Sequence, residues 1–205
     1  MKTLVAVVMA SLWIAGGALA QTQACYGWED GGTALGEFGN VNYFVDSTHV
    51  SEGSFALAIE ETGSGTGQIY VAWITNLTEG DEVTASFDVY DGSLLEGDSV
   101  YPRTRIWAHY SFADDIDGYD GSAGGNDTYS DGYGWNNLSY TWVIPEGKVA
   151  LVIEARPYGA DPFDQGYNWL DNLCVSAPES AWIYFPGGTV GTQNSSLSAV
   201  KALFR

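Results

Sequence analysis

The sequence predicts an all-β protein, built as a two-sheet antiparallel β-sandwich of the jelly-roll type with eight or nine strands. Three observations support this fold class. Several segments alternate apolar and polar residues with a period of two and are rich in β-branched and aromatic side chains, as in residues 83–89. Short clusters of turn-forming residues separate these segments. No long helical pattern appears between residues 21 and 177.

The expected strands follow one another along the chain. We place them at residues 42–45, 55–60, 69–74, 83–89, 103–110, 138–142, 149–156 and 169–175. Residues 113–134 form one long acidic segment with interleaved tyrosines, which predicts a functional or unstructured loop. This loop does not match a calcium-binding EF-hand, because its glycine comes too early and no glutamate stands at the twelfth place.

The first twenty residues have the pattern of an export signal. Lys2 gives a charged start, residues 4–17 form an apolar stretch, and residues 18–20 (ALA) place small residues where a signal peptidase reads. We expect residues 1–20 to be a signal peptide and the protein to be secreted, extracellular or at the cell surface. The alternative is a membrane anchor, but the apolar run is short for a bilayer core of ~30 Å. Nothing later in the chain is apolar enough to predict a membrane span.

The chain contains two cysteines, Cys25 and Cys174. Thiols oxidise outside the cytosol, and two cysteines permit a single pairing. The expected disulfide joins the first strand of the body to the last, and it would stabilise the body by roughly 4–5 kcal/mol in the chain-entropy model. The alternative is a pair of free, buried thiols.

Charge restricts the partners of this protein. The formal net charge is −19, from 26 acidic and 7 basic residues. Between residues 21 and 177 the cationic side chains are Arg103, Arg105, Lys148 and Arg156. Nucleic acid is therefore not an expected partner, because its binding requires clustered cations. Cations such as Ca²⁺ would be attracted to such a surface.

One β-sandwich domain is expected over residues 21–177. From residue 178 the composition changes, and residues 178–205 predict a linker followed by a short amphipathic tail. Leu197, Val200 and Phe204 share one face of a helical projection of this tail. We predict an envelope or self-assembly contact for the tail, and the alternative is a frayed terminus.

Three short motifs resemble those of a known group of domains. Residues 27–31 (GWEDG) resemble the opening motif of carbohydrate-binding-module-like, or galactose-binding-like, jelly rolls of secreted bacterial proteins. Residues 49–57 (HVSEGSFAL) resemble their second motif, and residues 168–173 (NWLDNL) resemble their closing strand. Together the motifs bracket about 150 residues, and they are more specific for the fold than for sugar binding.

The resemblance also implies a structural Ca²⁺ between the first strand, the turn of the second motif and the last strand. Matched residue by residue, its ligands would be the carboxylates of Glu29 and Asp171 and backbone carbonyls near Ser51 and Gly53. A mixed shell of carboxylate and carbonyl oxygens is normal for Ca²⁺. The alternative is that Asp171 caps a turn and that Glu29 faces water.

Glycan binding requires aromatic rings for the apolar faces of sugars and polar groups for their hydroxyls. Arg105, Trp107 and His109 alternate on one face of their predicted strand and are candidates for this role. Four further aromatic residues could form a platform beside them: Tyr119, Tyr129, Tyr133 and Trp135. The alternative is that strand aromatics fill the core. We expect a core position for Trp73 and Trp142, and both interpretations stay open for Trp107 and Trp135.

The sequence offers little support for catalysis, because it lacks a nucleophile elbow and a zinc-protease motif. We predict a secreted, non-catalytic module that recognises polysaccharide or cell-envelope glycan. One alternative is a structural or surface-assembly protein with the same sandwich. A less favoured one is a small polysaccharide hydrolase or lyase. A lyase built from Arg105, His109 and Tyr110 has poor geometry, since Tyr110 alternates away from His109.

Overall fold

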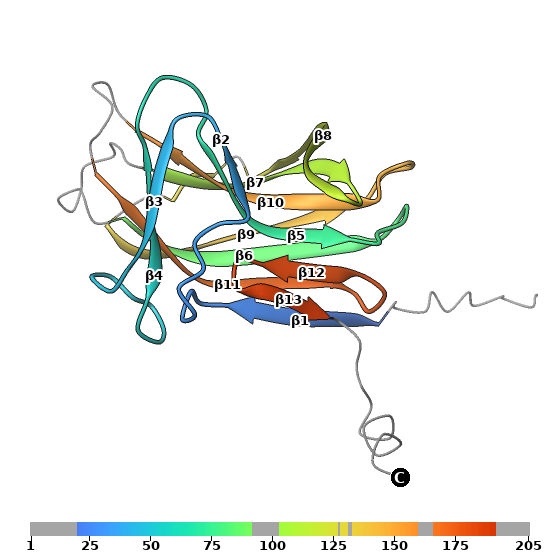
Figure 1. The fold of residues 1–205 in the computed structure, drawn as a ribbon, viewed down its shortest axis with the longest axis horizontal. Helices are drawn as coiled ribbons and strands as arrows, with labels where there is room; N and C mark the ends of the chain where they lie inside the picture. The colour runs from blue at the N-terminus through green and yellow to red at the C-terminus, as the bar shows by residue number, and fades with distance from the viewer. Residues whose placement is uncertain (1–19, 92–102, 127, 131–132, 160–165, 192–205) are drawn as a thin grey trace, which may run out of the picture.

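The computed structural model describes residues 20–91, 103–126, 128–130, 133–159 and 166–191. In these ranges the chain forms thirteen β-strands, arranged as two antiparallel sheets that pack against each other (Figure 1). The predicted fold class, a two-sheet antiparallel β-sandwich, is confirmed, but the described strands number thirteen instead of the predicted eight or nine. Within the same ranges no helix is long and apolar enough to cross a membrane.

Sheet A contains six of these strands. They are β1 (Gln21–Tyr26), β3 (Val41–Asp46), β4 (Ala56–Glu61), β6 (Glu82–Asp91), β9 (Gly134–Val143) and β11 (Asn168–Pro178). Their order is β3-β4-β11-β6-β9, and β1 also pairs with β11. The long strand β11 pairs with β4 through its first residues and with β1 through its last six.

Sheet B contains the other seven described strands. They are β2 (Gly36–Phe38), β5 (Gln68–Thr75), β7 (Arg103–Phe112), β8 (Asp115–Gly125), β10 (Ala150–Tyr158), β12 (Trp182–Phe185) and β13 (Gly188–Gly191). Their order is β13-β12-β5-β10-β7-β8, and β2 also pairs with β5.

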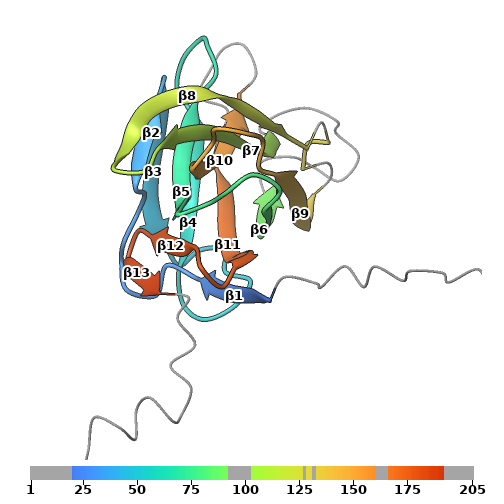
Figure 2. The same cartoon turned by 90° about the vertical axis from the view of Figure 1, so that its right-hand side faces the viewer.

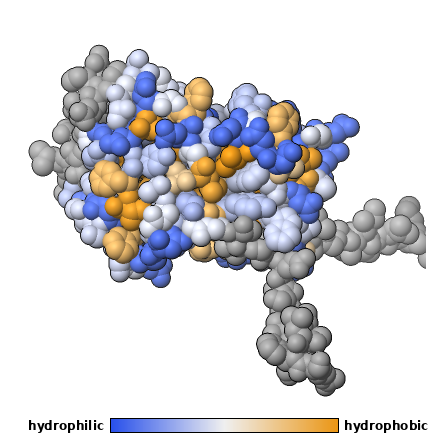
Figure 3. Space-filling model, in the orientation of Figure 1, coloured by the Kyte–Doolittle hydropathy of each residue, from blue (hydrophilic) through white to orange (hydrophobic). Residues whose placement is uncertain are grey.

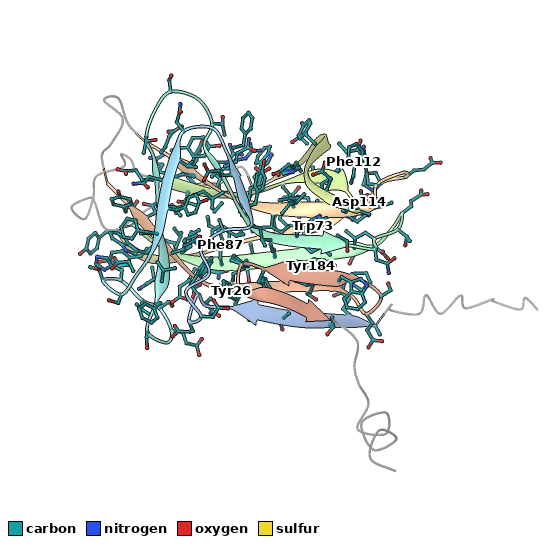
Figure 4. The ribbon with its side chains drawn as sticks, in the orientation of Figure 1. Tyr26, Trp73, Phe87, Phe112, Asp114 and Tyr184 are labelled. Atoms are coloured by element: carbon teal, nitrogen blue, oxygen red, sulfur yellow. A yellow bond between two sulfur atoms is a disulfide. The ribbon has the colours of Figure 1, made fainter. Side chains whose placement is uncertain are left out.

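Alternate residues of the strands build the core between the two sheets. In β6, the side chains of Val83, Ala85, Phe87 and Val89 are fully buried, while the residues between them are only partly buried. Figure 4 shows Phe87 within the body of the sandwich. The period of two therefore separates a core face from an outer face, as the sequence predicts.

Two tryptophans that we expected in the core differ in their position. Trp142 is buried, with 3% of its surface exposed, and belongs to the core. Trp73 is only partly buried, so the expectation of a core position is wrong for this residue. Its indole Nε1 donates a hydrogen bond to Ser111 Oγ, and its ring lies against Tyr184 of β12 at a centroid distance of 5.0 Å (Figure 4). Sheet B thus carries aromatic residues on its outer face.

The domain extends beyond the predicted boundary at residue 177. Residues 182–191 form the hairpin β12–β13 instead of a linker, and β12 pairs with β5 at the edge of sheet B. Ile183 and Phe185 are buried in the core, which explains why this segment is part of the domain. Residues 1–19 and 192–205 lie outside the described residues, so the signal peptide and the tail contact stay predictions.

The predicted loop at residues 113–134 also contains a strand. Residues 115–125 form β8, which pairs with β7 through a register with three shifts. The glycines and aspartates of this segment conceal its strand character, because they are rare in regular strands. Pairing with β7 outweighs this local preference.

The disulfide between Cys25 and Cys174 is confirmed. The two residues are direct partners in the register of β1 and β11, and their sulfur atoms are bonded at 2.05 Å. Figure 1 shows the first strand, β1, beside the late strands of the chain, and Figure 2 shows the same arrangement from the side. The bond therefore joins the first strand of the domain to β11, across a sequence separation of 149 residues, and the hairpin β12–β13 follows it in the chain.

Candidate functional site

A cleft lies on the outer face of sheet B, on the side that faces away from sheet A. It has a volume of about 530 Å³. Its lining residues are Phe38, Gln68, Tyr70, Asp117, Tyr119, Ser122 and Arg156. We refer to these seven residues as the cleft. They come from β2, β5, β8 and β10, so the cleft depends on the order of strands in sheet B.

Strand β8 forms one wall of the cleft. Its irregular register with β7 and its positive-φ glycines, Gly121 and Gly124, let it depart from the plane of the sheet. Figure 2 shows β8 arching over the sheet beside β7 and β10. Tyr119 projects from this strand and is 65% exposed. The acidic segment that the sequence marks as a loop therefore serves as a wall.

Strand β2 forms the opposite wall, beyond β5 in the strand order. Phe38 projects from it and is 61% exposed. Gly36 of β2 is tightly enclosed: a Cβ atom there would lie 2.7 Å from a ring carbon of Tyr70 and 3.5 Å from Asp117 Oδ1. Because Asp117 belongs to β8, the two walls approach each other at this glycine. Two exposed aromatic rings thus flank a floor formed by β5 and β10.

The floor of the cleft is polar and held in place by a buried network. Glu154 of β10 is fully buried, and its carboxylate contacts His109 Nδ1 at 2.5 Å and accepts a hydrogen bond from Arg156 Nε at 2.5 Å. Tyr70 is 7% exposed and borders this network, with its ring 5.0 Å from that of His109. Burial, together with the negative charge of Glu154, raises the pKa of Tyr70 to about 12. Tyr70 therefore stays protonated at neutral pH.

The predicted strand face of Arg105, Trp107 and His109 is the outer face of sheet B. The guanidinium groups of Arg105 and Arg156 each lie over the Trp107 ring, 4.7 Å from its centroid. Trp107 Nε1 donates a hydrogen bond to Ser122 Oγ of β8. Trp107 therefore faces outward and supports the wall of the cleft, although it does not line it.

His109 is also on this outer face, but it is 2% exposed and lies beneath the cleft. Its ring is 5.7 Å from that of Tyr119, the one predicted ligand residue that lines the cleft. Tyr129 lies farther along the face, where the Arg103 and Arg105 guanidinium groups lie 5.6 and 5.0 Å from its ring centroid. His109 thus lies beneath the cleft and Tyr129 lies farther along the same face, and neither residue lines the cleft.

Tyr133 and Trp135 do not belong to a platform beside Trp107, and this part of the prediction is wrong. Trp135 is a residue of β9 in sheet A, where it pairs with Tyr90 of β6. The ring of Tyr133 lies 5.9 Å from that of Tyr90. The segment that the sequence predicts as a single loop connects the two sheets, so its aromatic residues separate onto opposite faces.

Several cleft residues were not among the binding residues predicted from the sequence. Tyr70 and Arg156 alternate with core residues of their strands, so the outer-face pattern could have indicated them. Phe38 gave no such signal, because β2 has only three residues. Gln68 and Asp117 are brought to the cleft by the pairing of β2 with β5 and by the arch of β8.

The four predicted calcium ligands come together at another place in the fold. A hollow of about 320 Å³ is lined by residues that include Glu29, Gly53 and Asp171. Asp171 Oδ2 accepts hydrogen bonds from the amides of Ser51 and Glu52, at 2.8 and 2.9 Å. Glu29 Oε1 accepts hydrogen bonds from the backbone amides of residues 54 and 55. The loop of the second motif is thus bound to both carboxylates.

The negative charge of the Glu29 and Asp171 carboxylates in this hollow suits a cation, and these groups supply part of a coordination shell. Burial raises the pKa of Asp171, although three backbone amides oppose that rise, and the nearby carboxylate of Glu29 raises it further. A bound cation would relieve this unfavourable charge. In the described part of the chain, however, no three His, Cys, Asp or Glu side chains converge as a metal site. Backbone carbonyls and water would therefore have to complete the coordination shell.

Comparison with solved structures identifies this architecture. The CBM22-2 xylan-binding domain of Paenibacillus barcinonensis Xyn10C matches with a TM-score of 0.50 and 16% sequence identity, over 75% of this chain and 98% of that domain. The CBM22-1-CBM22-2 tandem of the same protein matches with a TM-score of 0.53 and 15% identity, over 79% of this chain and 48% of the tandem. The protein therefore has the β-sandwich fold of carbohydrate-binding modules. No family model and no curated protein matches its sequence.

Proposed function

We propose that this protein is a secreted, non-catalytic module that binds a polysaccharide chain in the cleft. The observation that carries the proposal is the placement of two exposed rings, Phe38 and Tyr119, on opposite walls above a polar floor. Aromatic rings provide apolar contact for the faces of sugar rings, while polar groups on the floor bind hydroxyls. The solved CBM22-2 xylan-binding domain, which has a similar fold, supports xylan as the first ligand to test.

The hydrogen-bonding groups of the cleft suit a neutral, hydroxyl-rich ligand. Gln68 supplies both an amide donor and an acceptor, Asp117 supplies acceptors, and Arg156 supplies donors. Arg156 is partly neutralised by its hydrogen bond to Glu154. The net charge of −19 disfavours strongly anionic glycans. Figure 3 shows that apolar residues on the face carrying β2, β3 and β5 form small patches among polar ones.

The arrangement of ionisable groups favours binding over catalysis. A glycosidase requires two carboxyl groups that flank the scissile bond. Glu154 is fully buried and already bound to His109 and Arg156, so it presents no free oxygen to a ligand. A lyase site built from Arg105, His109 and Tyr110 is also disfavoured, because Tyr110 belongs to the core on the opposite face of β7.

The binding proposal is tested by removing the two wall rings. Retention on insoluble xylan, cellulose, chitin and peptidoglycan is measured for the full chain and for Tyr119→Ala and Phe38→Ala. Both side chains are mostly exposed, so the variants should unfold at the same temperature as the full chain. Each should weaken binding to the retained polysaccharide at least about tenfold, which corresponds to about 1.4 kcal/mol.

Phe112→Ala is the matched control for these variants. Phe112 is 51% exposed on the same sheet, near the β7–β8 turn, and does not line the cleft (Figure 4). It should bind as the full chain does. Binding that is unchanged in both cleft variants, or release of reducing sugar by the full chain, would contradict the proposal.

We also propose that the hollow at Glu29 and Asp171 holds a structural Ca²⁺, which would neutralise the two carboxylates. Calcium at about a hundred times its dissociation constant adds about 2.7 kcal/mol to the free energy of unfolding. At about 2–4 °C per kcal/mol for a chain of this size, the melting temperature should rise by roughly 5–10 °C.

Differential scanning calorimetry with added Ca²⁺ and with a chelator measures this effect. Glu29→Gln is the informative variant, because its amide oxygen still accepts the two backbone hydrogen bonds while the charge is lost. This variant should unfold at a temperature that responds much less to Ca²⁺. A full chain whose melting temperature is the same with calcium and with chelator would exclude a structural ion.

A further inference from the structure

Sheet A carries a second group of aromatic side chains, on the face that points away from the core. The register places Phe44 opposite Ala58, Ala58 opposite Trp169, Trp169 opposite Tyr90, and Tyr90 opposite Trp135. The four aromatic residues therefore form a line across five strands, which we call the aromatic row. With about 4.8 Å between neighbouring strands, the line is about 19 Å long.

The aromatic row is accessible from solvent. Val89, the residue before Tyr90, is fully buried in the core, so Tyr90 and its partners in the line point outward. Phe44 is 41% exposed and Trp135 is 36% exposed, while Tyr90 and Trp169 are partly exposed. Both ends of the row are thus open to a ligand.

Contacts among the side chains fix the orientation of the rings. The His49 ring stacks on that of Tyr90 at 4.1 Å and meets the edge of Trp169 at 4.3 Å. Trp169 Nε1 donates a hydrogen bond of 2.8 Å to Asp46 Oδ2. The rings of Tyr90 and Trp135 are 5.4 Å apart. A ligand would therefore meet a rigid surface and would lose little of its binding energy in ordering side chains.

The charges around the row restrict its partner. The six strands of sheet A contain no lysine and no arginine, whereas β3 contributes Asp46 and β6 contributes Asp88. Asp88 lies two residues before Tyr90 on the same face and accepts a hydrogen bond from Asn137 Nδ2, its partner in β9. Nucleic acids and anionic membranes are repelled by such a surface, and so is a second copy of a chain with a net charge of −19. A neutral ligand rich in hydroxyl groups is not repelled, and it can donate hydrogen bonds to the carboxylates.

We propose that the aromatic row is a second binding surface, which takes a neutral polysaccharide chain on the side of the molecule opposite the cleft. The exposed rings of Phe44 and Trp135, at the two ends of the row, would stack on the faces of sugars in the chain. Asp46 and Asn42 would accept or donate hydrogen bonds at its margin. With the cleft also occupied, one molecule would hold two polysaccharide chains, one on each sheet. The inference does not require the cleft to bind.

The experiment compares the full chain with four variants. The row variant carries Phe44→Ala and Trp135→Ala, the cleft variant carries Phe38→Ala and Tyr119→Ala, and the third protein carries all four changes. Trp182→Ala is the matched control, because Trp182 is 40% exposed on β12 and lies on neither surface. Retention is measured on insoluble xylan, cellulose and chitin, and cross-linking is measured as turbidity with soluble xylan and soluble β-glucan.

The row variant should bind at least one of these polysaccharides about tenfold more weakly than the full chain, and the protein with four changes should not bind. The full chain should cross-link the soluble form of the polysaccharide that it binds, and neither variant should. Melting temperatures establish that each protein is folded. If the row variant unfolds, Phe44→Ala alone replaces it, because that ring is exposed at the end of the row.

Three results would overturn the inference. They are wild-type affinity of the folded row variant for every polysaccharide, absence of cross-linking by the full chain when the row variant and the cleft variant each still bind, and a full chain that is dimeric only when the row is intact. The last result would identify the row as a contact between copies. If the row variant loses binding while the cleft variant binds as the full chain does, the result would contradict the proposed function of the cleft and leave this inference standing.

Discussion

Glu154 illustrates how a single residue organises the cleft. A carboxylate in the middle of a strand is costly to bury unless it is paired. Its two oxygens bind His109 and Arg156, so the strand retains its position in the sheet while both partners are fixed. Arg156 in turn reaches the rings of Trp107 and the margin of the cleft. The buried group therefore acts through its neighbours, which explains why it is not itself exposed to a ligand.

Tyr70 gives a test of this network that does not depend on a ligand. Its pKa is about 12 in the folded protein, against about 10 in an unfolded chain. Below pH about 10 the phenol is neutral in both states. Between pH 10 and 12 the unfolded chain loses the proton first, so the free energy of unfolding should fall with rising pH.

Denaturant titrations at several alkaline pH values measure this slope. In Tyr70→Phe the slope between pH 10 and 12 should be smaller by at most about 1 kcal/mol per pH unit. Other tyrosines with raised pKa values contribute equally to both proteins, so the difference isolates Tyr70. An identical pH dependence in the two proteins would show that Tyr70 is not buried beside Glu154.

At the level of elements, the sequence predicts strands whose sides differ in polarity. Residues 83–89 were expected as a strand and lie within β6, because their alternation reflects a buried and an outer face. Strand β8 could not be predicted in this way, since its glycines and aspartates favour turns and only pairing with β7 makes it a strand. The four predicted calcium ligands could be grouped from motifs, whereas the cleft depends on β2 and β8, the two elements with the weakest local signals.

The hairpin β12–β13 supports a prediction about the domain boundary. Deleting residues 179–205 removes the buried side chains of Ile183 and Phe185 and exposes the edge of β5. Each of these side chains contributes about 1.5–3 kcal/mol on burial, so the deletion should lower the free energy of unfolding by at least about 3 kcal/mol.

Deleting only residues 192–205 is the control, because it leaves both strands in place. Thermal unfolding of the two shortened proteins should differ by several degrees, with the shorter protein less stable or unable to fold. Equal melting temperatures would show that the domain ends near residue 177, as the sequence alone suggests.

At the scale of the whole molecule, the sandwich presents two different outer faces. The outer face of sheet B has a cleft with cations around it, and that of sheet A has a row of rings without lysine or arginine in its strands. The disulfide joins the first strand of sheet A to its central strand β11. The two cysteines of an exported chain predicted this disulfide, but the separation of the aromatic residues onto two faces requires the strand order.

The most direct test of the proposed function is a nuclear magnetic resonance titration of the isotope-labelled protein with soluble xylo-oligosaccharides and with fragments of other polysaccharides that it retains. We expect the ligand to shift the backbone amide signals of Tyr70, Tyr119 and Ser122, and Tyr119→Ala to reduce the affinity measured from these shifts. A saturating ligand that leaves those three amides unchanged, or the absence of binding to any polysaccharide, would contradict the proposed function.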